Sequence, residues 1–243
     1  MEYNKDFFIF GEPIETIFGK VRFLTYREYL TKQSQLSLMS MNSLHIYYYF
    51  KEIDKNISSE ELEELRKLKD TPLLDIVMDI SIFKDTYQEI FSMVIEFKEE
   101  LSVDDIFSEN EIFMQMRKLV LDMNVTVEAE VSPNEEIQKA IERSRRVKQA
   151  EAEKQTFVDI ITSIVSSTSN SFEDVCNMNV MQVYAIYARI GAIFNYKTST
   201  LFATVAEKVD IELWNKHIDL FEQKSDTLTE NEFKSKFGGL FNL

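Results

Sequence analysis

The chain of 243 residues is long enough for one large domain or two modest domains. It contains 44% hydrophobic and 28% charged residues, as soluble globular proteins do, and its 5 Gly and 3 Pro are too few for an all-β fold with many tight turns. The 27 Lys and Arg against 42 Asp and Glu give a net charge of −15, which repels phosphate backbones and argues against a nucleic-acid partner. Partners with basic or apolar surfaces are favoured instead.

The single cysteine, Cys176, excludes a disulfide framework and fits a reducing cytoplasm. A membrane-spanning helix needs roughly 20 consecutive apolar residues, and no stretch of this chain approaches that length. We therefore expect no membrane partner. The N-terminal sequence MEYNKDFFIFGEP does not have the pattern of a signal peptide.

Residues 7–24 predict a small β element. The run FFIF precedes a turn at Gly11-Glu12-Pro13, and Gly19 interrupts a second run rich in β-branched and aromatic residues. This pattern favours two or three short strands that pack on helices, because an isolated hairpin is marginally stable. Thr25 is then expected to cap a short helix.

Residues 35–53 predict an amphipathic helix with Tyr47, Tyr48 and Tyr49 in a row. Three consecutive side chains cannot all face one core. Either the helix is half-buried with solvated tyrosine tips, or the tyrosines form part of a partner surface.

Further helices follow from capping signals, in which a Ser or Thr precedes an acid by three residues. Ser58 with Glu61 opens a charged helix that runs to Asp70, and Thr71-Pro72 opens a longer helix with apolar residues on one face as far as Val94. Two more such signals begin at Ser102 and Ser108, and the second opens a helix over 111–124.

A long connecting helix is predicted over 132–165, after an extended linker at 125–131. Ser132 is its expected cap, Pro133 its first helical residue and Glu135 the third position of a capping box. Its first part is polar nearly all round, whereas Phe157, Ile160, Ile161 and Ile164 predict a buried face farther along. Such a helix is typical of a connector between two packed bodies.

The C-terminal part begins with the polar break SSTSNS at 166–171. Ser171 with Asp174 predicts one cap, and a turn at 177–179 opens a long helix in which Gly191 suggests close helix packing. We expect two last helices, one capped by Asp210 over 211–221 and one capped by Thr229 that Gly238-Gly239 ends.

Residues 102–110 and 171–179 resemble each other, and so do the segments that begin at Met41 and Met178. These similarities indicate either duplicated helical units or the common sequence pattern of a capped helix, and the second explanation is favoured.

No catalytic constellation is visible, so we expect no enzyme, no metal and no cofactor. His45 and His217 lie among apolar helix residues, and no base accompanies Cys176. No phosphate-binding, dinucleotide-binding or zinc motif is present, and the basic run at 143–148 lies among acids. The 10 Met and 19 Phe either fill helical cores or form a surface that can repack around apolar helices.

The predicted fold is therefore mainly α. It comprises an acidic N-terminal helical module over 1–131 with a short β element at about 7–24, the connecting helix at 132–165 and a small C-terminal helical domain over 166–243. The net charge of −12 over 1–133, +1 over 134–155 and −4 over 156–243 agrees with this division.

Several segments resemble a group of helical tail-module proteins from phages and prophages of Gram-positive bacteria, which includes tail assembly chaperones. The similar segments are GEPIETIFGKVRFLTYREYL (11–30), MRKLVLDMN (116–124), SPNEEIQKAIERSRRVKQ (132–149), SFEDVCNMNVMQVYAIYARI (171–190) and LWNKHIDLF (213–221). They cover most of the chain as an order of pieces, and none is a catalytic signature.

The resemblance implies a tail assembly chaperone in the bacterial host cytoplasm, which binds the tape measure protein or other tail proteins and can form a homo-oligomer. Such a chaperone would keep the tape measure protein soluble until tail tube subunits displace it. The candidate partner-binding residues are Tyr184, Tyr187, Ile190, Phe194, Trp214, His217, Ile141 and Val147.

Two other functions stay open. The chain is alternatively a structural tail or baseplate protein of the virion, or a phage inhibitor of a host protein. A chaperone is absent from purified particles whereas a structural protein is stoichiometric, and an inhibitor copurifies with a host factor.

Overall fold

The computed structural model describes residues 3–53, 58–128, 130–151, 155–206 and 209–221. The fold is mainly α with a small three-stranded sheet, as the sequence predicts. It divides into two units, of which the first comprises Met1–Ala129 with Thr156–Phe221 and the second comprises Glu130–Gln155 with Glu222–Leu243.

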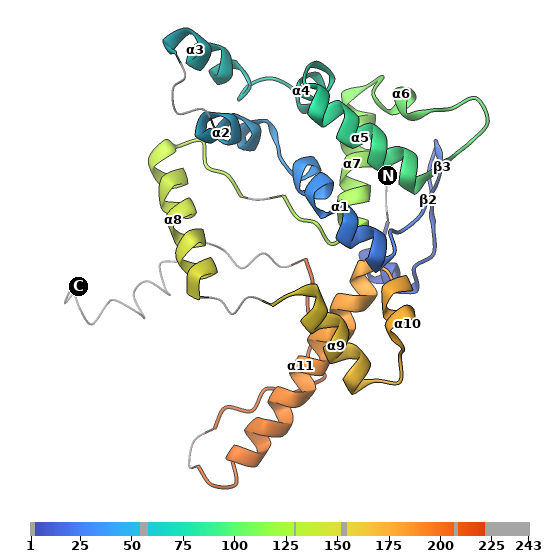
Figure 1. Ribbon diagram of the computed structural model, residues 1–243, viewed down its shortest axis with the longest axis vertical. Coiled ribbons are helices and arrows are strands. Elements are labelled where there is room, and N and C mark those ends of the chain that lie inside the picture. The colour runs from blue at the N-terminus through green and yellow to red at the C-terminus, as the bar shows by residue number, and fades with distance from the viewer. Residues whose placement is uncertain (1–2, 54–57, 129, 152–154, 207–208, 222–243) are drawn as a thin grey trace, which may run out of the picture. The chain divides into compact units, whose positions relative to one another are not determined.

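The first unit contains most of the elements, which Figure 1 colours along the chain. Its N-terminal part contains the 3₁₀-helix η1 (Lys5–Phe10), the strands β1 (Ile14–Glu15), β2 (Gly19–Val21) and β3 (Ile95–Phe97), and the helices α1 (Tyr26–Met39), α2 (Ser43–Ile53), α3 (Ser59–Lys67), α4 (Leu73–Asp79), α5 (Ser81–Val94), α6 (Val103–Ile106) and α7 (Asn110–Met123). Its C-terminal part contains α9 (Phe157–Ser167), α10 (Phe172–Asn177) and α11 (Val180–Phe202). The second unit contains α8 (Glu135–Glu151).

The sheet has the order β1-β2-β3, and both pairings are antiparallel. Its turn depends on Gly19, which has a φ of +143° and faces β3 so closely that a Cβ would lie 2.0 Å from the Glu96 carbonyl oxygen. The Thr16 hydroxyl closes the turn by accepting hydrogen bonds from the backbone N–H groups of Phe18 and Gly19. A side chain at Gly19 would therefore disrupt the pairing of β2 with β3.

The β element differs from the prediction in its composition. The run FFIF lies in η1 and is not a strand, and the third strand comes from residues after α5. Asn4 caps η1 by accepting a hydrogen bond from the Asp6 N–H, and Gly11 ends it in the left-handed region with a φ of 71°. Local capping therefore overrides the strand preference of the aromatic run.

Two hydrophobic clusters form the core of the first unit. The larger cluster joins the sheet to α1, α2 and α4–α7, and includes Val21, Leu36, Ile46, Phe83 and Leu119. The smaller cluster contains Tyr26, Ile161, Ile164, Val175, Val180 and Val183, which come from α1, α9, α10 and α11. Tyr26 therefore ties the start of α1 to the C-terminal helices.

The tyrosine row of α2 divides between core and surface. Tyr47 and Tyr48 are buried whereas Tyr49 is 38% exposed. The prediction that the three side chains cannot share one core is confirmed. Two of the predicted helices are interrupted. Residues 40–42 separate α1 from α2 within the range predicted as one helix over 35–53, and Ile80 separates α4 from α5 within the helix predicted from Thr71-Pro72 to Val94.

Most predicted caps are confirmed. Capping boxes join Thr25 to Glu28, Ser58 to Glu61, Ser102 to Asp105 and Ser171 to Asp174. The Ser108 cap is wrong, because Glu109 occupies the N-cap of α7 and makes no side-chain cap bond. The similar segments at 102–110 and 171–179 thus share the same capping geometry.

The single helix predicted over 132–165 is wrong, because two helices occupy this range. Asn134, and not Ser132, accepts hydrogen bonds from the Glu136 and Ile137 N–H groups at the start of α8. Thr156 forms a separate capping box with Asp159 at the start of α9. A helix that starts with its own box does not continue the preceding one, since the cap residue has extended backbone angles.

Three further predictions about the C-terminal part are wrong. Phe157 was expected in the core but is 52% exposed, because it occupies the first turn of α9. A Cβ on Gly191 would meet no atom within 4 Å, so this glycine does not mark a close helix contact. Residues 209–221 contain turns and bends in place of the helix expected there. The helix predicted after Thr229 lies outside the described residues.

Candidate partner-binding surface

Helix α11 is the element that carries the largest share of the predicted binding residues. Asn179 begins it through a capping box with Gln182. The helix packs against α9, α1 and η1 through its first half, and its second half extends beyond α9 and α10 in Figure 1. Its position is therefore fixed at one end only.

The first half of α11 is anchored to the N-terminal segment by polar contacts. Asn179 Nδ2 donates to the Phe8 carbonyl at 3.0 Å, and Gln182 Nε2 donates to the Ile9 carbonyl at 2.8 Å. The Tyr26 N–H donates to the Met178 carbonyl at 2.6 Å, just before the helix begins. Residues about 170 positions apart in the chain thus hold the helix start.

A cluster of three tyrosines lies where α1 meets α11. The Tyr29 and Tyr184 hydroxyls share a hydrogen bond at 3.3 Å, and the Tyr26 ring lies edge-on to the Tyr184 ring at a centroid distance of 6.2 Å. Burial raises the pKa of Tyr26 to about 12 and, together with the hydrogen bond that Tyr184 shares with Tyr29, raises the pKa of Tyr184 as well. Both hydroxyls are therefore neutral near pH 7 and serve packing and hydrogen bonding.

The apolar face of α11 changes from covered to exposed along the helix. Tyr187 and Ile190 are half-buried and pack against the smaller core cluster. Phe194 is 56% exposed, and the residues beyond it include Leu201 at 70% and Phe202 at 58%. Phe194 and Leu201 lie two turns apart on one side of the helix, and exposed large apolar side chains on a shared face are typical of an interaction surface.

Beyond the helix, the chain returns alongside α11. Arg189 Nη1 donates to the Trp214 carbonyl at 2.5 Å and to the Lys216 carbonyl at 2.9 Å. The Trp214 side chain remains 45% exposed, and His217 is also exposed. Because this segment is not helical, Trp214 and His217 do not share a helix face, as they would in the helix predicted over 211–221.

A hollow of about 590 Å³ lies between η1, α11 and this returning segment. Its lining is mixed, with apolar groups beside both signs of charge. It comprises Lys5, Asp6, Ile9, Met181, Ala185, Arg189, His217, Ile218, Asp219, Leu220 and Phe221. Lys5 lies over the Phe221 ring at 4.2 Å from the centroid, which closes one side of the hollow.

Two predicted binding residues lie in the other unit, on α8. Ile141 is 5% exposed whereas Val147 is 55% exposed. Six positions separate them, which places the two side chains on different sides of a helix. The structure therefore brings Tyr184, Tyr187, Ile190 and Phe194 onto one helix and links Trp214 to it, whereas Ile141 and Val147 lie on α8 and do not share one side of that helix.

The sequence reasoning did not single out Leu201, Phe202, Val205 or Arg189. The first three extend the exposed surface, and Val205 is 82% exposed. A usable signal was present, because residues 175–206 contain no Asp or Glu although the chain has 42 acids. Phe7 and Phe10 of η1, which are 63% and 66% exposed, were assigned to a strand instead.

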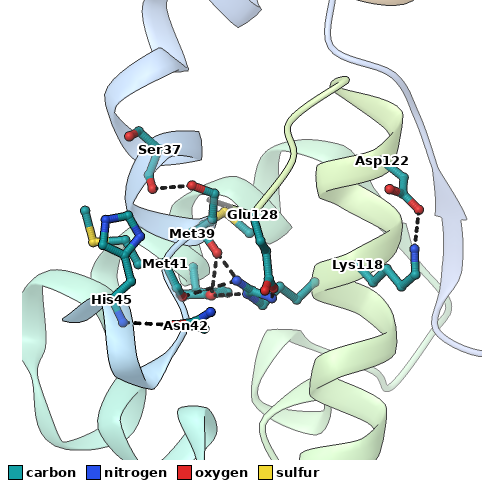
Figure 2. A network of polar contacts seen from close by, with 11 residues as sticks. Ser37, Met39, Met41, Asn42, His45, Lys118, Asp122 and Glu128 are labelled. Carbon is teal, nitrogen blue, oxygen red and sulfur yellow. Dashed lines mark hydrogen bonds and ion pairs between the residues drawn. The ribbon is translucent and has the colours of Figure 1, made fainter. Parts of the chain in front are cut away.

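A buried arginine forms an extended polar network within the first unit. Arg117, which is 1% exposed, donates from Nε to the Met39 carbonyl at 2.8 Å and to the Tyr87 hydroxyl at 2.9 Å, and from Nη2 to the Met41 carbonyl at 3.1 Å. Its Nη1 pairs with Glu128, and Figure 2 shows Met39, Met41 and Glu128 close together within this polar network.

This network fixes the junction of α1, α2, α5 and α7 and the start of the linker. Burial raises the pKa of Tyr87 to about 12, so its hydroxyl stays neutral and donates to the Met39 carbonyl at 3.1 Å. Every contact of Arg117 is to a backbone carbonyl, a hydroxyl or a carboxylate of the same unit. The arrangement stabilises the fold and does not itself offer a reaction centre.

In the part of the chain that the structure describes, no three His, Cys, Asp or Glu side chains lie close enough to share a metal ion. Cys176 is half-buried at the end of α10. Among the described helices, none combines the length and the apolarity that crossing a bilayer requires.

Comparison with known proteins identifies both parts of the chain. Residues 2–133 match the family described as the YomV N-terminal domain, and residues 148–219 match the YomV second domain. The chain is 30% identical over 243 residues to the SPbeta prophage-derived uncharacterized protein YomV of Bacillus subtilis (strain 168), with 98% of this chain and 100% of the relative covered. These matches support a phage-derived protein. No solved structure matches the chain.

Proposed function

The chain belongs to the YomV family, and from this premise we propose that it is a phage tail assembly chaperone, a binding protein and not an enzyme. It would bind the tape measure protein in the host cytoplasm and keep it soluble before the tail tube polymerises. The supporting observation is the uncovered apolar surface at the end of α11, where Phe194, Leu201 and Phe202 are each more than half exposed.

The physical task of such a chaperone follows from the nature of a tape measure protein. A long helical chain has apolar faces without partners until the tube forms around it. Covering apolar area stabilises by about 25 cal/mol per Å², so a few large side chains supply modest affinity at each contact. Several bound copies add up to strong retention, yet each copy can be displaced one at a time.

The charge of the chain suits this role. A net charge of −15 keeps coated chains apart from each other, because like-charged particles repel. The exposed end of α11 is free of acids, so an apolar helix that lies there buries no carboxylate of α11.

Coexpression provides the test. The full chain is produced together with segments of the tape measure protein encoded by the same phage, and the soluble fraction of each segment is measured with and without it. We expect a soluble complex only when both are present. Segments that are equally soluble alone would contradict the proposal.

A pair of variants locates the surface. Phe194→Asp with Leu201→Asp should abolish solubilisation, since both side chains lie on the exposed part of α11. The matched control is Ile53→Asp with Ile82→Asp, which changes two apolar side chains that are 63% and 54% exposed on α2 and α5. We expect the control to retain solubilisation, and circular dichroism to show that both variants remain helical.

The alternative functions give different results in the same system. Stoichiometric amounts of the protein in purified virions would indicate a structural tail or baseplate component. Copurification with a single host protein, and not with a tail protein, would indicate an inhibitor.

A further inference from the structure

The uncovered part of α11 continues a face that is covered earlier in the helix. Tyr187, Ile190, Phe194 and Leu201 follow one another at steps of three, four and seven residues, which places them along one side of a helix. The first two pack on the smaller core cluster together with α9. Phe194 and Leu201 extend the same face for two more turns with 56% and 70% of their surfaces exposed.

The helix that carries this face contains no acidic residue. Residues 175–206 contain no Asp or Glu, and their only charged side chains are Arg189 and Lys197. Lys197 lies three positions after Phe194, with its ammonium 5.8 Å from the centre of the Phe194 ring. The ammonium therefore borders the exposed apolar side chains.

Arg189 adds a second positive group on the same helix. Its Nη1 donates to two backbone carbonyls of the returning segment, and within the described residues no carboxylate forms an ion pair with its guanidinium. This guanidinium lines the hollow together with Asp6 and Asp219 and lies on a different side of the helix from Phe194, so it is Lys197 that borders the exposed face.

Local charges decide which partner fits, although the whole chain has a net charge of −15. At physiological ionic strength, charges more than about 8 Å apart are largely screened. A helix lying on Phe194 and Leu201 would therefore respond to Lys197 more than to charges beyond that distance.

We infer that the uncovered face of α11 binds an amphipathic helix whose apolar stripe is flanked by acidic residues. This inference rests on the proposed function, because the amphipathic helix it describes would be a segment of the tape measure protein. The net charge of the whole chain favours basic partners, whereas this face favours an acidic one. The apolar stripe supplies the contact area, and the acidic flank pairs with Lys197, whose ammonium lies 5.8 Å from the centre of the Phe194 ring.

The test uses the purified full chain and three fluorescent helical peptides with the same leucine stripe. Their flanking positions are all Glu, all Gln or all Lys. Binding is measured by fluorescence anisotropy at about 150 mM salt, where the Debye length is about 8 Å. We expect the Glu peptide to bind about 10-fold more tightly than the Lys peptide, since the Glu flanks attract the Lys197 ammonium and the Lys flanks repel it.

Charge reversal at Lys197 should invert this order. Lys197→Glu is compared with Lys139→Glu, which makes the same change in net charge at an exposed position of α8. Only the first variant should weaken the Glu peptide and strengthen the Lys peptide, and Lys197→Gln should lie between. Thermal unfolding followed by circular dichroism establishes that all variants fold.

Several results would overturn the inference. These are tighter binding of the Lys peptide to the unchanged protein, an order of peptides that Lys197→Glu leaves unaltered, or no binding of any peptide. Self-association that Lys197→Glu abolishes, in the absence of peptide binding, would assign the face to a second copy of the chain instead.

The two proposals fail separately. If the Glu peptide binds as expected but coexpressed tape measure segments stay insoluble, the chaperone function is wrong and the surface assignment stands. If the segments are solubilised but Lys197→Glu changes no peptide preference, the function stands and the acidic-flank inference is wrong.

Discussion

The hydroxyl groups of Tyr29 and Tyr184 lie 3.3 Å apart, although 155 positions separate the two residues in the chain. Their hydrogen bond links α1, which borders both hydrophobic clusters, to α11, which carries the candidate binding surface. The exposed half of α11 is therefore supported by contacts at its other end.

Tyr184→Phe removes this hydrogen bond and keeps the ring. We expect the free energy of unfolding to fall by about 0.5–1.5 kcal/mol, because the Tyr29 hydroxyl loses its partner in a half-buried site. Urea denaturation gives the value. The matched control is Tyr49→Phe, which removes a hydroxyl from a side chain that is 38% exposed on α2; an equal loss in both variants would contradict the role of the Tyr29–Tyr184 bond.

Arg117→Met should be strongly destabilising. The change leaves the Met41 carbonyl without its arginine donor and Glu128 without its ion pair, so we expect a loss of about 2–4 kcal/mol in the free energy of unfolding. The neighbouring Lys118→Met alters a side chain that is 66% exposed and should change stability far less. Similar midpoints in urea for the two variants would show that the buried network does not stabilise the junction.

The Arg22–Glu28 pair predicts a specific dependence of stability on pH. Two hydrogen bonds of 2.9 Å from Arg22, together with those from Thr25, lower the pKa of Glu28 below its ordinary value. A carboxylate with a lowered pKa in the folded state stabilises the protein above its unfolded-state pKa of about 4.3. This contribution is lost as the pH falls from there through the folded-state pKa.

We therefore expect the free energy of unfolding to decrease less between pH 6 and pH 3 in Glu28→Gln than in the unchanged protein. Arg22→Met should reduce the pH dependence in the same way, and the double variant should add little to either. Urea denaturation at several pH values measures all four proteins. Additive effects of the two changes would contradict direct coupling.

Thr156→Ala tests the separate start of α9. The Thr156 hydroxyl accepts a hydrogen bond from the Asp159 N–H, and the Asp159 carboxylate accepts from the Thr156 N–H. Without the box, amide hydrogens in the first turns of α9 should exchange about three to ten times faster. Thr162→Ala, which changes an exposed threonine inside the same helix, is the control and should leave the exchange rates unchanged. A continuous helix through Thr156 would show no difference between the variants.

The local signals in the sequence predicted much of the fold correctly, because helix starts depend on neighbouring residues. The boxes of Ser58 with Glu61 and Ser171 with Asp174 form as expected. Where the same chemistry occurs twice within a few residues, the sequence does not decide between the candidates. At the start of α8, Asn134 accepts the capping hydrogen bond that the sequence assigns to Ser132. Farther along, Thr156 caps α9 and so divides the predicted connecting helix in two.

Long-range contacts decided the rest. Strand β3 forms because Gly19 allows the Glu96 backbone to approach β2, and no local pattern announces that pairing. Arg117 is a charged residue on a helix, so its sequence context suggests a solvent-exposed side chain. In the structure it is buried and donates a hydrogen bond to the carbonyl of Met41, which lies 76 positions away in the chain.

The sequence by itself determined the composition of the candidate surface, since the absence of acids from 175–206 and the apolar spacing of α11 are properties of the chain alone. Only the tertiary structure decided which part of that apolar face is covered. Tyr187 and Ile190 meet α9 and the smaller core cluster, whereas Phe194 and Leu201 lie past them and stay exposed. Identical spacing gives core or surface according to what packs against it, and that depends on residues distant in the chain.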